Sequence, residues 1–165
     1  MGKYALDMDK YIALARRTAA EGCVLLKNDN HTLPLRKGDR VAVFGRIAFD
    51  YYKSGLGSGG LVNTRYVVGI LDALREEADF SVDEKLLNIY KEWIKDHPYD
   101  GGGGWGLVPW SQKEMPLSDE VVEQAATEND IAIVIVGRTA GEDQDNAAEQ
   151  GSYQLPDAER DMIAR

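Results

Sequence analysis

Acidic side chains gather in one loop of this chain, Arg138 to Asn146, which follows the apolar run Ile131 to Val136. Carboxyl groups can exchange protons with a substrate or supply oxygen ligands to a cation. Ligands of open α/β sheets collect at the carboxyl ends of the strands, so a loop in this position is a candidate site. Composition alone favours the simpler alternative, a solvated surface turn. The charged residues of the loop are Arg138, Glu142, Asp143 and Asp145.

Metal binding is not favoured by the spacing of the available ligands. Asp143, Asp145 and Glu149 offer carboxylate oxygens to calcium, but they lack the spacing of an EF-hand loop. His31 lies in a predicted turn and His97 at a predicted helix end, and neither has a partner at a metal-ligand spacing. We therefore expect no metal, and we interpret both histidines as structural or solvated.

A second candidate site is the glycine-rich stretch Tyr51 to Asn63, in which Gly55, Gly57 and Gly60 match the pattern G-x-G-x-x-G. In a dinucleotide-binding turn these glycines follow the strand directly, whereas bulky residues such as Tyr52 intervene here. The sequence also lacks the acidic residue that would bind the ribose at the end of a second strand. Nucleotide binding is therefore disfavoured. A loop that lets backbone approach a ligand or another domain suits these glycines better.

Tryptophan and glycine mark the irregular stretch Tyr99 to Leu117, which includes the glycine run Gly101 to Gly104. Trp105 and Trp110 have two interpretations. They anchor this stretch against the domain, or they face a partner or a sugar ring, because an indole stacks well on the apolar face of a pyranose. The sequence leaves both interpretations open.

Hydrophobic periodicity predicts an α/β domain that positions these loops. Val41 to Phe44 and Ile131 to Val136 are apolar throughout, as expected for parallel strands buried on both faces. These two strong strands are too few for a complete doubly wound domain, so we expect a domain truncated at its C-terminus, with the missing strands beyond Arg165. Shorter strands are expected at Val24 to Leu26 and Phe80 to Val82. The predicted helices run from an Asp7 cap to Glu21, from Asn63 or Thr64 to about Ala78, from Asp83 to about Asp96, from Ser118 to Glu128, and from Asp157 onward, with Pro156 at the first turn of the last one.

Composition restricts the class of protein. With 165 residues and 44% hydrophobic content, the chain can form one sizeable core. Its net charge of -9 and pI near 4.7 argue against nucleic acid and an anionic membrane as partners. No apolar run approaches a membrane span and the amino terminus lacks an apolar signal core, which predicts a cytoplasmic protein. The lone Cys23 is predicted to be a small buried side chain rather than a nucleophile.

Family membership is indicated by three stretches taken together: ARRTAAEGCVLLKNDNHTLPL from Ala15 to Leu35, SGLGSGG from Ser54 to Gly60, and IVIVGRTAGEDQDN from Ile133 to Asn146. In this order and spacing they resemble the α/β sandwich domain of glycoside hydrolase family 3, the β-glucosidase type. The resemblance covers most of the chain and implies a three-layer α/β/α sandwich with a mostly parallel sheet, flavodoxin-like in class. In most members this domain follows a (β/α)8 barrel, which is absent from this chain. A start near Met1 and the stretch Trp105 to Leu117 resemble the subgroup with inverted domain order.

The resemblance implies a catalytic role for Glu142. Members of the family are retaining enzymes, in which an aspartate of the barrel is the nucleophile and a glutamate of the sandwich domain is the acid/base. The motif that carries this glutamate, S-G-E-G-x-D-R, places the role on Glu142. This sequence departs from the motif at Ala140, Asp143 and Asn146, where the family has Ser, Gly and Arg. Retaining hydrolysis uses two carboxyl groups about 5–5.5 Å apart, of which Glu142 is the expected proton donor.

The resemblance thus implies a domain of a retaining β-glucosidase that hydrolyses terminal non-reducing β-D-glucosyl residues. We expect no cofactor, and as partners a β-glucoside or oligosaccharide and the barrel of the same protein. Because the nucleophile lies outside the chain, the chain alone is expected to be inactive. The alternatives are a non-catalytic carbohydrate-binding or domain-interface module and, more weakly, a nucleotide-binding flavodoxin-like domain. Substrate contacts are expected from Gly57, Ser58, Trp105, Trp110 and Asp145.

Overall fold

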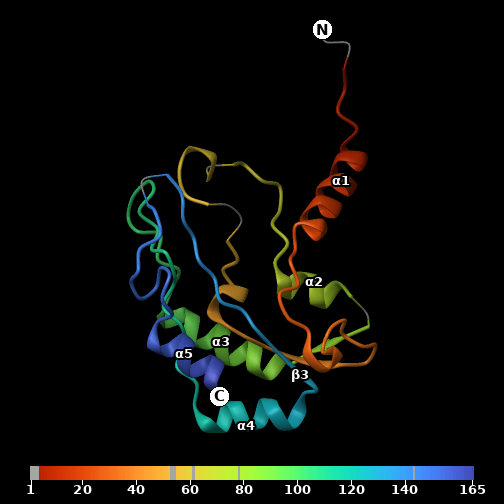
Figure 1. The fold of residues 1–165 in the computed structure, drawn as a ribbon, viewed down its shortest axis with the longest axis vertical. Coiled ribbons are helices and arrows are strands. Elements are labelled where there is room, and N and C mark those ends of the chain that lie inside the picture. The colour runs from red at the N-terminus through yellow and green to blue at the C-terminus, as the bar shows by residue number, and fades with distance from the viewer. Residues whose placement is uncertain (1–3, 53–54, 61, 78, 143) are drawn as a thin grey trace. The chain divides into compact units, whose positions relative to one another are not determined.

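The structure is a computed structural model that describes residues 4–52, 55–60, 62–77, 79–142 and 144–165. It divides into two compact units, Met1–Leu35 and Arg36–Arg165. Figure 1 shows the elements of both units along the chain. None of the described helices has the length and apolar character needed to cross a membrane.

The first unit contains helix α1 (Met8–Glu21). Asp7 caps the helix by accepting a hydrogen bond from the backbone N–H of Lys10 at 3.2 Å, and Gly22 ends it, both as the sequence predicts. The predicted strand Val24 to Leu26 is wrong, because these residues pair with no strand in the described part of the chain and are exposed. An apolar run forms a strand only where a neighbour satisfies its backbone groups. Cys23 is also exposed, which corrects the prediction of a buried side chain.

The second unit is built on a parallel sheet, which within the described residues has three strands in the order β2-β1-β3. The strands are β1 (Arg40–Phe44), β2 (Ser81–Val82) and β3 (Ile131–Val134). Val41 of the central strand pairs with Val82 on one side and with Ile131 on the other. β1 is buried from its second residue to its end, as predicted for a central parallel strand.

The described helices of this unit are α2 (Ile70–Glu76), α3 (Glu84–Asp96), α4 (Asp119–Glu128) and α5 (Asp157–Ala164). The predicted caps of α3 and α4 are confirmed. Asp83 accepts hydrogen bonds from the first N–H groups of α3, and Ser118 accepts one at the start of α4. Helix α5 begins at Asp157, as predicted, and Pro156 stands directly before its first turn rather than in it.

Helix α2 starts later than the sequence predicts. The carboxylate of Asp72 accepts the backbone N–H of Gly69 at 2.9 Å, and the helix begins from this contact. Val67 and Val68, which were expected on the buried face, therefore lie outside the helix and are exposed. The expected caps Asn63 and Thr64 are wrong for the same reason.

The main core lies between one face of the sheet and the helices α3, α4 and α5, which Figure 1 shows gathered together. At its centre Tyr90 is fully buried, and its hydroxyl accepts the N–H of Gly45 at 3.0 Å. This contact fixes the carboxyl end of β1, and burial raises the pKa of Tyr90. The arrangement is an α/β sandwich, which confirms the predicted fold class. The buried residues of this core are Ala42, Phe44, Leu86, Tyr90, Met115, Leu117, Ala125 and Met162.

The prediction that Ile131 to Val136 is buried on both faces is wrong. β3 ends at Val134, and its side chains alternate between half-buried and exposed. In the described residues β3 has a neighbouring strand on one side only, so it forms an edge. Ala132 and Val134 border an apolar groove of about 330 Å³ between β3 and the helices α4 and α5.

Candidate active site

Two loops of the second unit meet at the candidate site: the glycine loop (residues 55–60) and the acidic loop (residues 138–146). The N–H of Leu56 donates to the carbonyl oxygen of Ala140 at 3.0 Å, and Leu56 forms a parallel bridge with Gly141. Two residues further along, the N–H of Ser58 donates to Oε2 of Glu142 at 3.0 Å. The structure therefore brings together two predicted site residues that lie 84 positions apart in the sequence.

Glycine is required where these loops touch. A Cβ atom on Gly55 would lie 2.8 Å from the carbonyl oxygen of Ala140, and one on Gly141 would lie 2.3 Å from that of Leu56. Gly57 has a φ of 97°, a left-handed conformation that side chains disfavour. The sequence predicts close approach of the glycine backbone to a ligand or another domain. In the structure that backbone approaches the acidic loop of its own unit.

The carboxyl group of Glu142 is held but remains accessible. Its side chain is exposed, and the backbone N–H of Ser58 orients one of its two oxygens. A carboxyl group in this setting can exchange a proton with a molecule that reaches the loop. Asp145 is exposed on the same loop, whereas Asp143 lies outside the described residues. Across the described residues no group of three or more His, Cys, Asp or Glu side chains is arranged to hold a metal ion.

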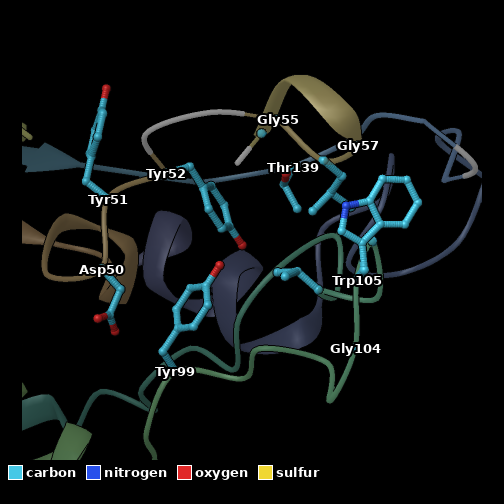
Figure 2. Close-up of a pocket in the computed structure, with 13 residues that line it drawn as sticks. Asp50, Tyr51, Tyr52, Gly55, Gly57, Tyr99, Gly104, Trp105 and Thr139 are labelled. Carbon is cyan, nitrogen blue, oxygen red and sulfur yellow. The ribbon is translucent and has the colours of Figure 1, made fainter. Parts of the chain in front are cut away.

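A cavity of about 410 Å³ lies beside the glycine loop. Gly57 lines it from one side and Trp105 from the other, so two predicted substrate-binding residues share one space. Figure 2 shows this cavity between the glycine loop and the segment that carries Tyr99 and Trp105. Glu142 does not line the cavity itself. It is joined to the glycine wall through the N–H of Ser58.

Tyr52 and Tyr99 are site residues that sequence reasoning missed. Both line the cavity, their rings meet edge to face with centroids 6.3 Å apart, and Figure 2 shows their hydroxyl groups turned toward each other. Burial raises the pKa of both phenols. The buried hydroxyl of Tyr52 makes no hydrogen bond of ordinary geometry within the described residues, although the side chain of Gln112 lies close. The sequence feature that could have identified them is that each tyrosine closely precedes several glycines.

Trp110 holds a different place from Trp105. It does not line the cavity, and its carbonyl oxygen accepts the N–H of Thr139 at 2.8 Å. Its indole Nε1 is buried without a hydrogen-bond partner in the described structure. Trp110 thus joins the irregular stretch to the start of the acidic loop, whereas Trp105 is half exposed at the cavity.

Buried charges support the wall behind the cavity, and sequence reasoning missed these as well. Arg46 is 1% exposed, and its guanidinium forms an ion pair with Asp50 at 2.9 Å. The carboxylate of Glu114 accepts the N–H groups of Arg46 and Met115, each at 2.8 Å. Burial raises the pKa of Glu114. These contacts fix the chain after β1, where Asp50 reaches the cavity, to the end of the irregular stretch.

Comparison with known protein families gives a match over most of the chain. The family model described as "Glycosyl hydrolase family 3 C-terminal domain" matches residues 23–165. A "Beta-glucosidase" from Ruminococcus albus is 51% identical over 160 residues, which cover 97% of this chain and 17% of the relative. "Beta-glucosidase A" from Butyrivibrio fibrisolvens is 34% identical over 163 residues, covering 98% of this chain and 19% of the relative. The chain therefore spans less than a fifth of the length of these two relatives.

Solved structures agree with the sequence matches. The crystal structure of a β-glucosidase from Paenibacillus barengoltzii superposes with a TM-score of 0.90 at 52% identity, covering 99% of this chain and 17% of that chain. β-Glucosidase 3B from Thermotoga neapolitana, solved in complex with glucose, superposes with a TM-score of 0.81 at 30% identity. That match covers 95% of this chain and 22% of that chain.

Proposed function

Because this chain belongs to glycoside hydrolase family 3, through that family's C-terminal domain, we propose that it supplies the general acid/base of a retaining β-glucosidase. Glu142 is the residue proposed for this role. The observation that carries the proposal is the position of its exposed carboxyl group, which the N–H of Ser58 orients where the glycine and acidic loops meet. The names of the relatives support glucosides as the substrate class.

The proposed chemistry needs a second carboxyl group from another part of the protein, about 5–5.5 Å from Glu142. That group attacks the anomeric carbon, the bond to the leaving oxygen breaks, and the Glu142 carboxyl gives its proton to that oxygen. In the second step the Glu142 carboxylate takes a proton from water, and the water oxygen displaces the enzyme from the sugar. We place the second carboxyl group on an aspartate of a (β/α)8 barrel, as the family resemblance implies.

The cavity beside the glycine loop is proposed as part of the substrate-binding site. Trp105 offers an indole face to a sugar ring, and the buried hydroxyl of Tyr52 offers a hydrogen-bond partner to a sugar hydroxyl. Gly57 brings backbone to the wall of the same cavity, whereas Ser58 does not line it and donates its N–H to Glu142. The proposed substrate is a terminal β-D-glucosyl unit. A cytoplasmic location stays a prediction from the sequence.

The test uses the full-length enzyme that contains this chain and compares Glu142→Gln with the matched control Glu149→Gln. Glu149 is an exposed glutamate just beyond the same loop. We expect Glu142→Gln to lower kcat about 10²- to 10⁴-fold on glucosides with a weakly acidic leaving group. On dinitrophenyl glucoside, whose leaving group needs no proton, Glu142→Gln should lower the rate of the first step only slightly. Wild-type turnover of both substrates by Glu142→Gln would refute the assignment.

A second candidate function is a carbohydrate-binding module without catalysis. The observation that favours it is that the described residues lining the cavity, Trp105 among them, all belong to the second unit. Calorimetric titration of the 165-residue chain with glucose and cellobiose separates the two functions. Binding by the chain alone supports the module, whereas no binding supports a site that needs the second carboxyl-bearing domain.

A further inference from the structure

Both ends of the acidic loop are tied to one buried residue, Ser152, which is 2% exposed. At the start of the loop, Nε of Arg138 donates to the carbonyl oxygen of Ser152 at 2.7 Å. At the end of the loop, the N–H of Ala147 donates to Oγ of Ser152 at 2.9 Å. The Ser152 hydroxyl in turn reaches Oδ1 of Asn146 at 3.5 Å. One residue therefore sets the distance between the two ends of the loop.

Arg138 is itself fixed to helix α5. Its Nη1 and Nη2 donate to the two carboxylate oxygens of Glu159 at 2.8 and 2.5 Å, a two-point geometry that orients the guanidinium plane. Nη1 also donates to the carbonyl oxygen of Gly137 at 2.8 Å. The side chains of Arg138 and Glu159 are 22% and 5% exposed, so the pair is largely shielded from water. Loss of either partner leaves the other charge buried and uncompensated.

These contacts involve other residues of the acidic loop than those that the glycine loop contacts. Ser152 and Arg138 hold its two ends, while Leu56 and Ser58 contact its middle at Ala140 and Glu142. A loop fixed at both ends and at its tip has little freedom to shift. An error of about 1 Å in the position of a reacting group can cost about 10²-fold in rate, so such restraint has a catalytic consequence.

We propose that Ser152 and Arg138 are positioning residues, which fix the span of the acidic loop and thereby place the Glu142 carboxyl group. The catalytic part of this inference rests on the proposed function, whereas the structural part does not. Asn146, which stands where the family motif has arginine, takes part in the same set of contacts, because its Oδ1 accepts the Ser152 hydroxyl.

The structural part is tested on the 165-residue chain by amide hydrogen exchange measured with NMR. The reporter is the N–H of Ser58, because it donates to Glu142 and contacts neither Ser152 nor Arg138. Ser152→Ala and Arg138→Lys should each raise its exchange rate about tenfold, while the amide of Val43 in β1 stays protected. Arg138→Lys keeps the charge but loses the two-point geometry. The control is Arg75→Lys, which alters a similar pair, Arg75 and Glu84, remote in sequence from the acidic loop.

Two results overturn the structural part. One is an unchanged Ser58 exchange rate in Ser152→Ala and Arg138→Lys. The other is an equal rise at Ser58 and Val43, because the contacts then support only the overall stability of the unit.

The catalytic part is tested in the full-length enzyme. Ser152→Ala should lower kcat about tenfold on glucosides with a weakly acidic leaving group, with KM within twofold of wild type. It should leave kcat/KM on dinitrophenyl glucoside nearly unchanged, because this ratio reports the first step, in which that leaving group needs no proton. A purely structural role lowers kcat/KM of both substrates alike, which would contradict positioning. If Glu142→Gln keeps wild-type activity, the proposed function fails, and the exchange experiment still decides whether Ser152 and Arg138 hold the loop.

Discussion

Gly57 and Glu142 pack so closely that a Cβ atom on Gly57 would lie 2.6 Å from the Cβ of Glu142 and 2.9 Å from its Oε2. No residue with a side chain fits this contact without moving the carboxyl group. The glycine loop therefore sets the position of the candidate acid/base, as well as forming a wall of the adjacent cavity. This contact joins the glycine-rich motif to the acidic motif, which lie far apart in the sequence.

Gly57→Ala should displace Glu142 and destabilise the second unit. The matched control is Gly38→Ala, since Gly38 has a similar φ of 93° but nothing within 4 Å of an added Cβ. Both variants lose about 1–3 kcal/mol of unfolding free energy to backbone strain. Gly57→Ala should lose more and should also speed exchange at the Ser58 amide. Equal losses in urea unfolding, with Ser58 unchanged, would show that the contact is not restrictive.

Trp105→Ala should weaken substrate binding with little effect on stability, because its side chain is about half exposed. Loss of an aromatic contact at a binding site commonly costs about 1–2 kcal/mol, which corresponds to a roughly tenfold rise in KM. The control is Tyr153→Ala, an aromatic residue that is 82% exposed and does not line the cavity. KM values for aryl glucosides in the full-length enzyme decide the point. An unchanged KM in Trp105→Ala removes this side chain from the proposed site.

Glu114 should make the free energy of unfolding fall as the pH rises above the ordinary pKa of a glutamate. Burial raises the pKa of Glu114 in the folded chain above the value of 4.5 for the free side chain. At a pH between these two pKa values the folded state therefore binds more protons than the unfolded state. The stabilisation is complete below pH 4.5 and is lost as pH rises through the folded pKa. Glu114→Gln should flatten this part of the curve of unfolding free energy against pH. The same slope in Glu114→Gln and in the exposed control Glu123→Gln would contradict the assignment.

Asp130 should act in the opposite direction at acid pH. Its carboxylate accepts hydrogen bonds from the side chain and the backbone N–H of Arg40, and these contacts lower its pKa from 3.8 to about 2. The stabilisation is present above pH 3.8 and is lost as pH falls through about 2. Asp130→Asn should therefore remove part of the acid dependence between pH 4 and 2. Circular dichroism of acid unfolding measures this, and identical profiles for wild type and variant would disprove the contribution.

Local signals in the sequence were sufficient for the helices with a capping side chain. Asp7, Asp83 and Ser118 satisfy the first N–H groups of their helices, and this chemistry depends only on nearby residues. The predicted start of α2 was wrong because the helix is capped from inside by the Asp72 carboxylate. In the sequence, Asn63 and Thr64 are equally suitable capping residues, so the sequence did not favour the later start. Burial was less predictable. The apolar character of β3 and Cys23 does not reveal which neighbours are present to cover them.

The candidate site was predictable as separate parts but not as an arrangement. Glu142, Ser58 and Gly57 were found through the family motifs, and the structure joins them. Tyr52 and Tyr99 were missed because tyrosines near glycines occur in many loops, and only the fold turns these two toward each other. The hydrogen bonds of Arg138 with Glu159 and Ser152 were likewise not predicted, since they depend on how α5 packs beside the acidic loop.

Chemical rescue of Glu142→Ala by azide tests the central claim most directly. In a retaining enzyme that lacks its acid/base, the glycosyl-enzyme formed from dinitrophenyl glucoside persists, because no carboxylate deprotonates water. Azide needs no deprotonation, so it should raise kcat at least about tenfold and yield β-glucosyl azide, whereas Glu149→Ala should show neither effect. Hydrolysis by Glu142→Ala at the wild-type rate, with no azide product, would contradict the account.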